Sequence, residues 1–75
     1  MYLLSQDKQT LMRFSRVSIS GHLGGKASLQ AQPLGLDDGL HAISIGSYPD
    51  EAAAAAELQR IVNALHAGLA VYEVN

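Results

Sequence analysis

The chain contains no cysteine, so disulfide bonds and cysteine-ligated metal sites are excluded. This absence also fits a reducing compartment. Nowhere do about 18 apolar residues run together, which is the length that a membrane-spanning helix needs. The opening residues MYLLSQDKQT place no basic cluster before an apolar run, so we expect no signal peptide. We therefore predict a cytoplasmic protein without a membrane partner.

Charge is scarce as well. Only 16% of the 75 residues are charged and 48% are hydrophobic, which is typical of a globular chain. We expect one domain over residues 1–75 with a small core, because a chain this short buries only about 60–65% of its unfolded surface. Small domains gain stability from disulfides, metals or oligomerisation. Because disulfides are excluded, self-association becomes a more strongly expected source of stability.

Alternating apolar and polar residues predict five short strands before the first helix, with the merging of the first two or three as the alternative. They cover residues 1–5, 11–14, 16–23, 26–32 and 40–46. The first two flank a polar turn, as in a hairpin, and a glycine turn at GHLGG separates the third from the fourth. Pro33 ends the fourth strand because it cannot donate to a ladder. Asp38–Gly39 predicts a turn before the fifth strand, which should pair antiparallel with the fourth and place Ile43 and Ile45 on its core face.

The period of the pattern changes after Pro49. Asp50 is a good N-cap and Gly68 suits a left-handed C-cap, so we predict a helix over residues 51–66 and a last strand over 69–75. The expected core stripe of this helix consists of Ala54, Leu58, Ile61, Val62 and Leu65. Strands first and a helix late predict an α+β fold. It would be an antiparallel β-sheet of four to six short strands with one helix packed on one face.

The five consecutive alanines at 52–56 are not equivalent on this helix. Ala52, Ala53 and Ala56 fall beside Arg60, away from the expected core stripe. They make a small, smooth surface that is a candidate site for close packing with another helix or a second copy. The simpler interpretation is that alanine is there only because it is the best helix former.

No catalytic, cofactor-binding or metal-binding residues are predicted. His22, His41 and His66 are 19 and 25 residues apart, which matches no metal signature. The segment GHLGGKAS departs from a phosphate-binding loop, because Ser20 and Ala27 stand where glycine and a hydroxyl residue belong. No G-x-S-x-G motif occurs. We therefore expect no enzymatic activity, short of a site shared between subunits.

A basic cluster in the first half of the chain offers an alternative function. Residues 1–35 hold four basic residues and one acidic residue, and the remainder holds one basic and six acidic residues. Arg13, Arg16 and Lys26 are the candidate contacts to nucleic acid, with Phe14 as a ring on which a base could stack. The net charge of −2 and the absence of a recognised motif weigh against this alternative, and Phe14 is expected in the core.

Three segments resemble parts of a group of short, uncharacterised proteins from Gram-positive bacteria and their phages. They are MYLLSQDK at residues 1–8, SYPDEAAAAAELQRIVNAL at residues 47–65 and VYEV at residues 71–74. The group opens with Met-x-Leu-x-Ser and carries a tyrosine before a capped helix, although its helix holds more Glu and Lys than this one. Residues 15–40 do not share the pattern. The resemblance implies a small α+β protein of unknown function and supplies no functional residues.

The expected function is that of a non-catalytic interaction or regulatory module that forms a homodimer or binds another protein. Strand edges are templates for pairing, and two-fold symmetry is the commonest way to use them. Residues 1–5 or 71–75 are the strands expected to pair across the interface. A small ligand bound in a groove between subunits is a third possibility that the sequence does not resolve.

Overall fold

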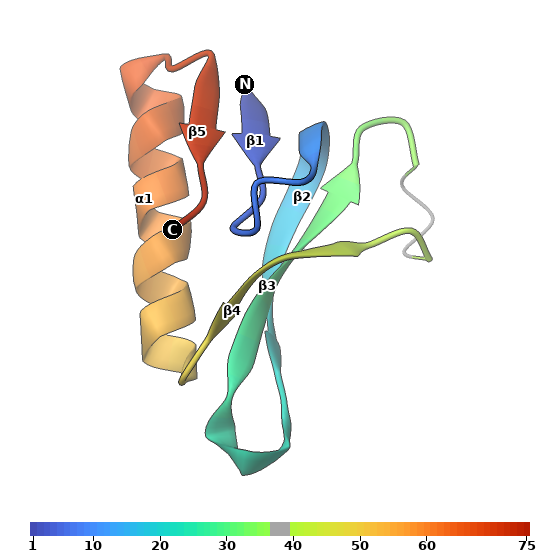
Figure 1. Ribbon diagram of the computed structural model, residues 1–75. Coiled ribbons are helices and arrows are strands. Elements are labelled where there is room, and N and C mark those ends of the chain that lie inside the picture. The colour runs from blue at the N-terminus through green and yellow to red at the C-terminus, as the bar shows by residue number, and fades with distance from the viewer. Residues whose placement is uncertain (37–39) are drawn as a thin grey trace.

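The chain begins with the predicted hairpin. In the computed structural model, which describes residues 1–36 and 40–75, β1 (Tyr2–Leu4) pairs antiparallel with β2 (Leu11–Gly21), with Tyr2 opposite Arg13. Hydrogen bonds from Ser5 and Lys8 close the turn between them. The hairpin predicted across QDKQT is therefore confirmed (Figure 1).

A β-bulge joins the two strands predicted for residues 11–14 and 16–23 into the single strand β2. Ser15 is the extra residue, because Phe14 pairs with Pro33 whereas Arg16 pairs with Gln32. One extra residue shifts the inward–outward alternation by one position. Phe14 and Val17 therefore both pack against the core although they are three residues apart. The shift explains why the sequence pattern appears interrupted at this point.

Two further strands extend the sheet as predicted, with corrected bounds. A turn that includes a short 3₁₀ segment, η1 (Leu23–Gly25), leads into β3 (Ala27–Pro33), which pairs with β2. β4 (Ile43–Tyr48) pairs antiparallel with β3 and lies two to three residues later than predicted. The turn predicted at Asp38–Gly39 lies outside the described residues.

A second bulge lies in β4, at Ile45. Ile45 is buried in the core, as predicted, but Ile43 stands at the start of β4 and is 38% exposed. Ile43 nevertheless pairs with the core residue Ala31, so it lies on the predicted face of the sheet. The backbone N–H of Gln6 donates to the Ile45 carbonyl, so the β1–β2 turn reaches β4 although β2 and β3 lie between them in the sheet. This contact requires a strongly curved sheet.

The helix α1 (Glu51–Ala67) follows β4 directly. The Asp50 carboxylate accepts a hydrogen bond from the N–H of Ala53 at 2.7 Å, which is the predicted N-cap. Gly68 has a left-handed φ of 73°, and the N–H groups of Gly68 and Leu69 return to carbonyls of the last turn. No helix among residues 1–36 and 40–75 is long and apolar enough to cross a membrane.

After α1 the chain returns along the helix as β5 (Val71–Glu73) and pairs with β1 (Figure 1). The strand order is β4-β3-β2-β1-β5, and β5 runs parallel to β1. The predicted α+β class with one helix on a sheet is confirmed, but the sheet is mixed rather than wholly antiparallel.

The buried side of α1 is rotated relative to the predicted stripe. Ala54 and Ile61 are in the core as expected, whereas Leu58 and Val62 are only half-buried and Leu65 is 48% exposed. Glu57 and Ala64 are buried instead. The physical reason is that Glu57 finds hydrogen-bond partners inside the fold, which the aliphatic pattern alone does not reveal.

Candidate functional site

The most unusual side chain in the fold is the buried carboxylate of Glu57. Its exposed fraction is 0%, and it accepts three hydrogen bonds. They come from Arg60 Nη1 at 2.6 Å, from the Tyr72 hydroxyl at 2.7 Å and from the backbone N–H of Asn75 at 2.9 Å. A buried charge is tolerated only when it is paired and hydrogen-bonded, and Glu57 meets both conditions. This carboxylate therefore ties the residues after β5 to α1.

These partners also set the protonation state of Glu57. Burial alone would raise the pKa of its carboxyl, but the hydrogen bonds from Asn75, Tyr72 and Arg60 outweigh burial and hold the pKa below its usual value. The positive charge of Arg60 acts in the same direction. Glu57 is consequently a carboxylate near neutral pH and serves as an acceptor.

Side chains from three other parts of the chain hold Asn75. Its carbonyl oxygen accepts from Gln6 Nε2 at 3.2 Å and from the Tyr48 hydroxyl at 2.7 Å. The Asn75 side-chain amide donates to the Tyr72 hydroxyl at 3.2 Å. The turn after β1, the end of β4 and the middle of α1 therefore meet at Asn75. We call Gln6, Tyr48, Glu57, Arg60, Tyr72 and Asn75 the Glu57 cluster.

The tyrosines of the Glu57 cluster are not poised for acid–base chemistry near neutral pH. Burial, reinforced by the negative charge of Glu57, raises the pKa of Tyr48 to about 12. Burial and the hydrogen bond that it donates to Glu57 also raise the pKa of Tyr72. General acids and bases work best with a pKa near the working pH. The shifts of Tyr48, Tyr72 and Glu57 all move away from neutrality, so the cluster is better suited to holding structure.

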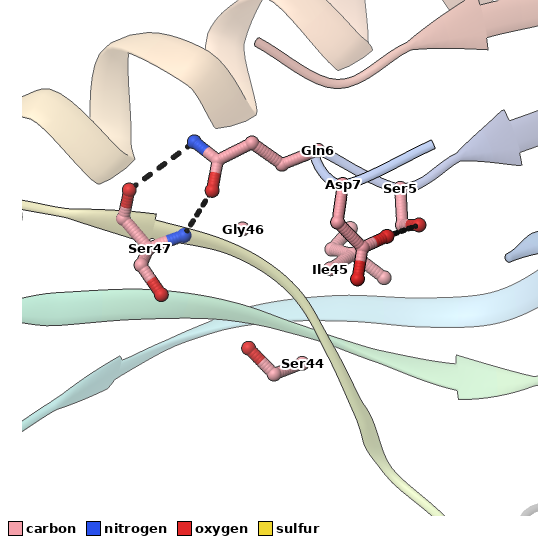
Figure 2. A pocket seen from close by; sticks show the side chains of 7 residues that line it. All are labelled: Ser5, Gln6, Asp7, Ser44, Ile45, Gly46 and Ser47. Carbon is pink, nitrogen blue, oxygen red and sulfur yellow. Dashed lines mark hydrogen bonds between the residues drawn. The ribbon is translucent and has the colours of Figure 1, made fainter. Parts of the chain in front are cut away.

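A shallow polar pocket of about 170 Å³ lies beside the cluster, between the β1–β2 turn and β4. It is lined by Ser5, Gln6, Asp7, Ser44, Ile45, Gly46 and Ser47. Figure 2 shows Gln6 reaching across to the backbone of Ser47. The Ser47 N–H donates to Gln6 Oε1 at 2.9 Å, and Gln6 Nε2 donates to the Ser47 carbonyl at 3.2 Å. The other lining side chains belong to the turn itself or to the bulged part of β4.

The one carboxylate of this pocket is already used by the turn. The Ser5 hydroxyl donates to Asp7 at 2.6 Å and the Gln9 N–H donates at 3.0 Å. These two hydrogen bonds lower the pKa of Asp7. Within the described parts of the chain, no three histidine, cysteine or acidic residues come together to hold a metal ion. The pocket offers hydroxyl and amide groups to a small polar molecule.

The four residues of the candidate interaction surface on α1 differ in exposure. Ala52, Ala56 and Arg60 are exposed, and Ala53 is half-buried. Ala53, Ala56 and Arg60 lie within about 100° of the buried Glu57 around the helix, so they flank the buried side of α1. Because Glu57 contacts Tyr72 and Asn75, this flank of α1 borders the chain segment that carries β5.

The candidate nucleic-acid contacts Arg13, Arg16 and Lys26 are all exposed. They do not form one compact patch, because Lys26 lies opposite His22 at the far end of the β2–β3 hairpin. Phe14 packs against the core, as expected, and is not available for stacking. The ring that lies beside an arginine is Tyr2, 6.0 Å from the guanidinium of Arg13.

The three histidines lie apart in the fold. His22 Nε2 is 2.9 Å from the Ser28 hydroxyl, between the ends of β2 and β3. His66 is exposed in the last turn of α1, where the helix dipole favours positive charge. His41 is exposed just before β4. Their separation agrees with the spacing in the sequence.

The sequence pattern does not predict the burial of Glu57, because a glutamate on an amphipathic helix usually faces solvent. A signal was nevertheless present in the spacing. Residues 54, 57, 61 and 64 follow the three-and-four spacing of one helix face, and three of the four are Ala or Ile. An acidic residue at such a position, with tyrosines just before and after the helix, indicates a buried carboxylate with hydroxyl donors.

No family model, curated protein or solved structure matches this chain. The resemblance to short proteins of Gram-positive bacteria and their phages therefore stays a prediction.

Proposed function

We propose that this chain is a non-catalytic protein-interaction module that forms a homodimer by antiparallel pairing of β5 with β5 of a second copy. The observation that carries the proposal is the position of β5. Among the described residues, β5 pairs only with β1 and ends the sheet on that side. The alternative expectation, pairing through residues 1–5, is wrong, because β1 lies between β2 and β5 inside the sheet.

The direction of the backbone groups of β5 supports this pairing. The Ala70 carbonyl accepts from Tyr2, and the Val74 N–H donates to Leu4. In a strand, alternate residues direct their backbone groups to the same neighbour. Val71 and Glu73 therefore direct theirs away from β1. In a two-fold pair centred on Tyr72, Val71 of one copy would lie opposite Glu73 of the other.

The surroundings of this edge also suit a second copy. Leu65, Leu69 and Val71 are each between 46% and 48% exposed at the junction of α1 and β5. The flank of Ala53 and Ala56 leaves room for close approach on the helix side. A domain with a small core gains stability from burying such residues between copies. The cytoplasmic location expected from the sequence is part of the same proposal.

Val71→Pro tests the edge directly. Proline has no N–H, and the N–H of Val71 is one that points away from β1, so the change should block the partner strand and leave the β1–β5 pair. We expect the wild type to dimerise within about 1–100 µM in sedimentation equilibrium, as a small interface allows, and Val71→Pro to stay monomeric. Val71→Thr keeps the N–H and should dimerise like the wild type.

A monomeric wild type throughout that range would refute the homodimer. A Val71→Pro variant that still dimerises would place the interface elsewhere. Circular dichroism of both variants checks that the fold is retained.

Ala56→Glu tests the contribution of the helix flank. A charged side chain on the flank that borders β5 should hinder a second copy and weaken dimerisation by about 10-fold or more, because burying an unpaired charge is unfavourable. Ala55→Glu is the matched control, since Ala55 belongs to the same exposed run but lies about 160° from Glu57 around the helix. Equal dissociation constants for the two variants would mean that the alanines serve only helix formation.

A further inference from the structure

The outer face of the sheet, opposite α1, has a charge pattern that the homodimer does not explain. β1, β2, β3 and β4 contain no aspartate and no glutamate. Their only charged residues are Arg13 and Arg16, and Lys26 directly precedes β3. The sheet is therefore cationic although the whole chain has a net charge of −2.

The fold turns all three of these cations to the same face. Phe14 and Val17 pack against the core, so the bulge at Ser15 leaves Arg13 and Arg16 on the outer side of β2. In β3 the core residues are Ala27, Leu29 and Ala31. Strand alternation then places Lys26 on the outer side. Without the bulge, residues 13 and 16 would lie on opposite faces.

These cations follow a line along the β2–β3 hairpin. Lys26 lies opposite His22, and His22 is nine residues after Arg13 in the sequence. Nine residues correspond to about 25–30 Å of strand. Exposed Ser18 lies on the same face of β2 between them. The line is too long for one phosphate group but matches the backbone of several consecutive nucleotides.

An aromatic ring stands at one end of the line. Tyr2 is 43% exposed and pairs with Arg13 across β1 and β2. The guanidinium of Arg13 lies 6.0 Å from the centre of the Tyr2 ring. A ring on an open sheet beside an arginine is the arrangement on which unpaired bases stack in single-strand-binding proteins.

Acidic groups of the described residues lie off this line. Asp50, Glu51 and Glu57 belong to α1 and its N-cap, on the core side of the sheet. Glu73 of β5 pairs with Leu4 and lies 3.9 Å from Lys8, and Asp7 lies in the β1–β2 turn, where it accepts hydrogen bonds from Ser5 and Gln9. A polyanion on the line from Arg13 to Lys26 would therefore meet cations and hydroxyl groups.

We propose that the outer face of β1 and β2, together with Lys26 before β3, binds single-stranded nucleic acid. Arg13, Arg16 and Lys26 would contact successive phosphates, and Tyr2 would stack on a base at the Arg13 end. A double helix is disfavoured because its bases are already stacked on one another and cannot reach Tyr2. This surface borders the β5 edge, because Tyr2 pairs with Val71, but the inference does not depend on the homodimer.

Fluorescence anisotropy with a labelled single strand of about 10 nucleotides tests the proposal, since small β folds cover sites of roughly 4–16 nucleotides. Binding is measured separately for single-stranded RNA and DNA of the same mixed sequence, for their duplexes and for heparin. With three phosphates neutralised, the slope of log affinity against log salt should be about −2, so affinity should fall about 20-fold between about 50 and 200 mM salt. Either single strand should bind more tightly than its duplex and heparin.

Variants separate stacking from charge. Tyr2→Leu keeps an apolar strand residue without a ring and should weaken binding by about 5-fold to 100-fold, whereas Tyr2→Phe should bind like the wild type. Arg13→Gln should make the salt slope shallower by about 0.7. Gln59→Glu is the matched control, because it changes the net charge by the same amount on the exposed side of α1 and should leave binding unchanged.

Several results would overturn the proposal. They are no binding of either single strand at the lower salt, tighter binding of duplex or heparin, a Tyr2→Leu variant equal to the wild type, and a Gln59→Glu variant as weak as Arg13→Gln. Circular dichroism of each variant establishes that a loss of binding is not a loss of fold.

Discussion

Glu57→Ala should lower the free energy of unfolding by about 2–4 kcal/mol, because it breaks a buried network of hydrogen bonds. The substitution removes the acceptor for the Tyr72 hydroxyl and the Asn75 N–H, and it leaves Arg60 without its partner. A buried donor that loses its acceptor costs about 1–3 kcal/mol by itself. Urea unfolding followed by circular dichroism measures the difference.

Glu57→Gln is the control for shape. The glutamine side chain has the same size and keeps one oxygen acceptor, so we expect a smaller loss of about 1–3 kcal/mol. The two variants together separate the contribution of the charge from that of the hydrogen bonds. A Glu57→Ala variant within about 1 kcal/mol of the wild type, the range of an ordinary surface substitution, would contradict the role given to the Glu57 cluster.

The same carboxylate predicts part of the pH dependence of stability. The pKa of Glu57 is lower in the folded chain than its ordinary value, so its contribution is fully present above the unfolded pKa of about 4.3. That contribution is lost as the pH falls through the folded pKa. The stability of Glu57→Gln should therefore fall less steeply than that of the wild type below about pH 4.5. The lowered pKa of Asp7 leaves both proteins some acid sensitivity.

Ile61→Ala should cost about 2–5 kcal/mol, whereas Leu65→Ala should cost less than about 1 kcal/mol. Ile61 is 1% exposed at the centre of the contact between α1 and the sheet, and Leu65 is half-exposed one turn later. The pair tests the rotation of α1 directly, because the aliphatic pattern of the sequence places both residues in the core. Equal losses of stability in thermal unfolding would mean that both residues belong to the core, as the sequence pattern predicts.

Local sequence determines most of the elements of this fold. Asp50 and Gly68 fix the ends of α1 because their preferred conformations are those of helix caps. The QDKQT and GHLGG segments produce the two turns predicted for them. These features depend on neighbouring residues alone, which is why they can be recognised without a structure.

Features that depend on residues far apart in the sequence cannot be predicted from local sequence alone. The bulges at Ser15 and Ile45 become visible only through the pairing of β2 and β4 with β3. Burial of Glu57 requires Tyr72 and Asn75, which lie 15 and 18 residues further along the chain. Similarly, Arg13, Arg16 and Lys26 were identified from the sequence, but only the bulge reveals that they share one face.

Pairing of two copies through β5 can be observed directly. The most direct measurement is an isotope-filtered NOE experiment on an equal mixture of ¹³C,¹⁵N-labelled and unlabelled chains. We predict NOEs between copies from the backbone protons of Val71 to those of Glu73, and of Tyr72 to Tyr72, as in antiparallel pairing. Dimers whose intermolecular NOEs come only from other strands or from α1, or samples without any at dimer-forming concentration, would contradict the claim.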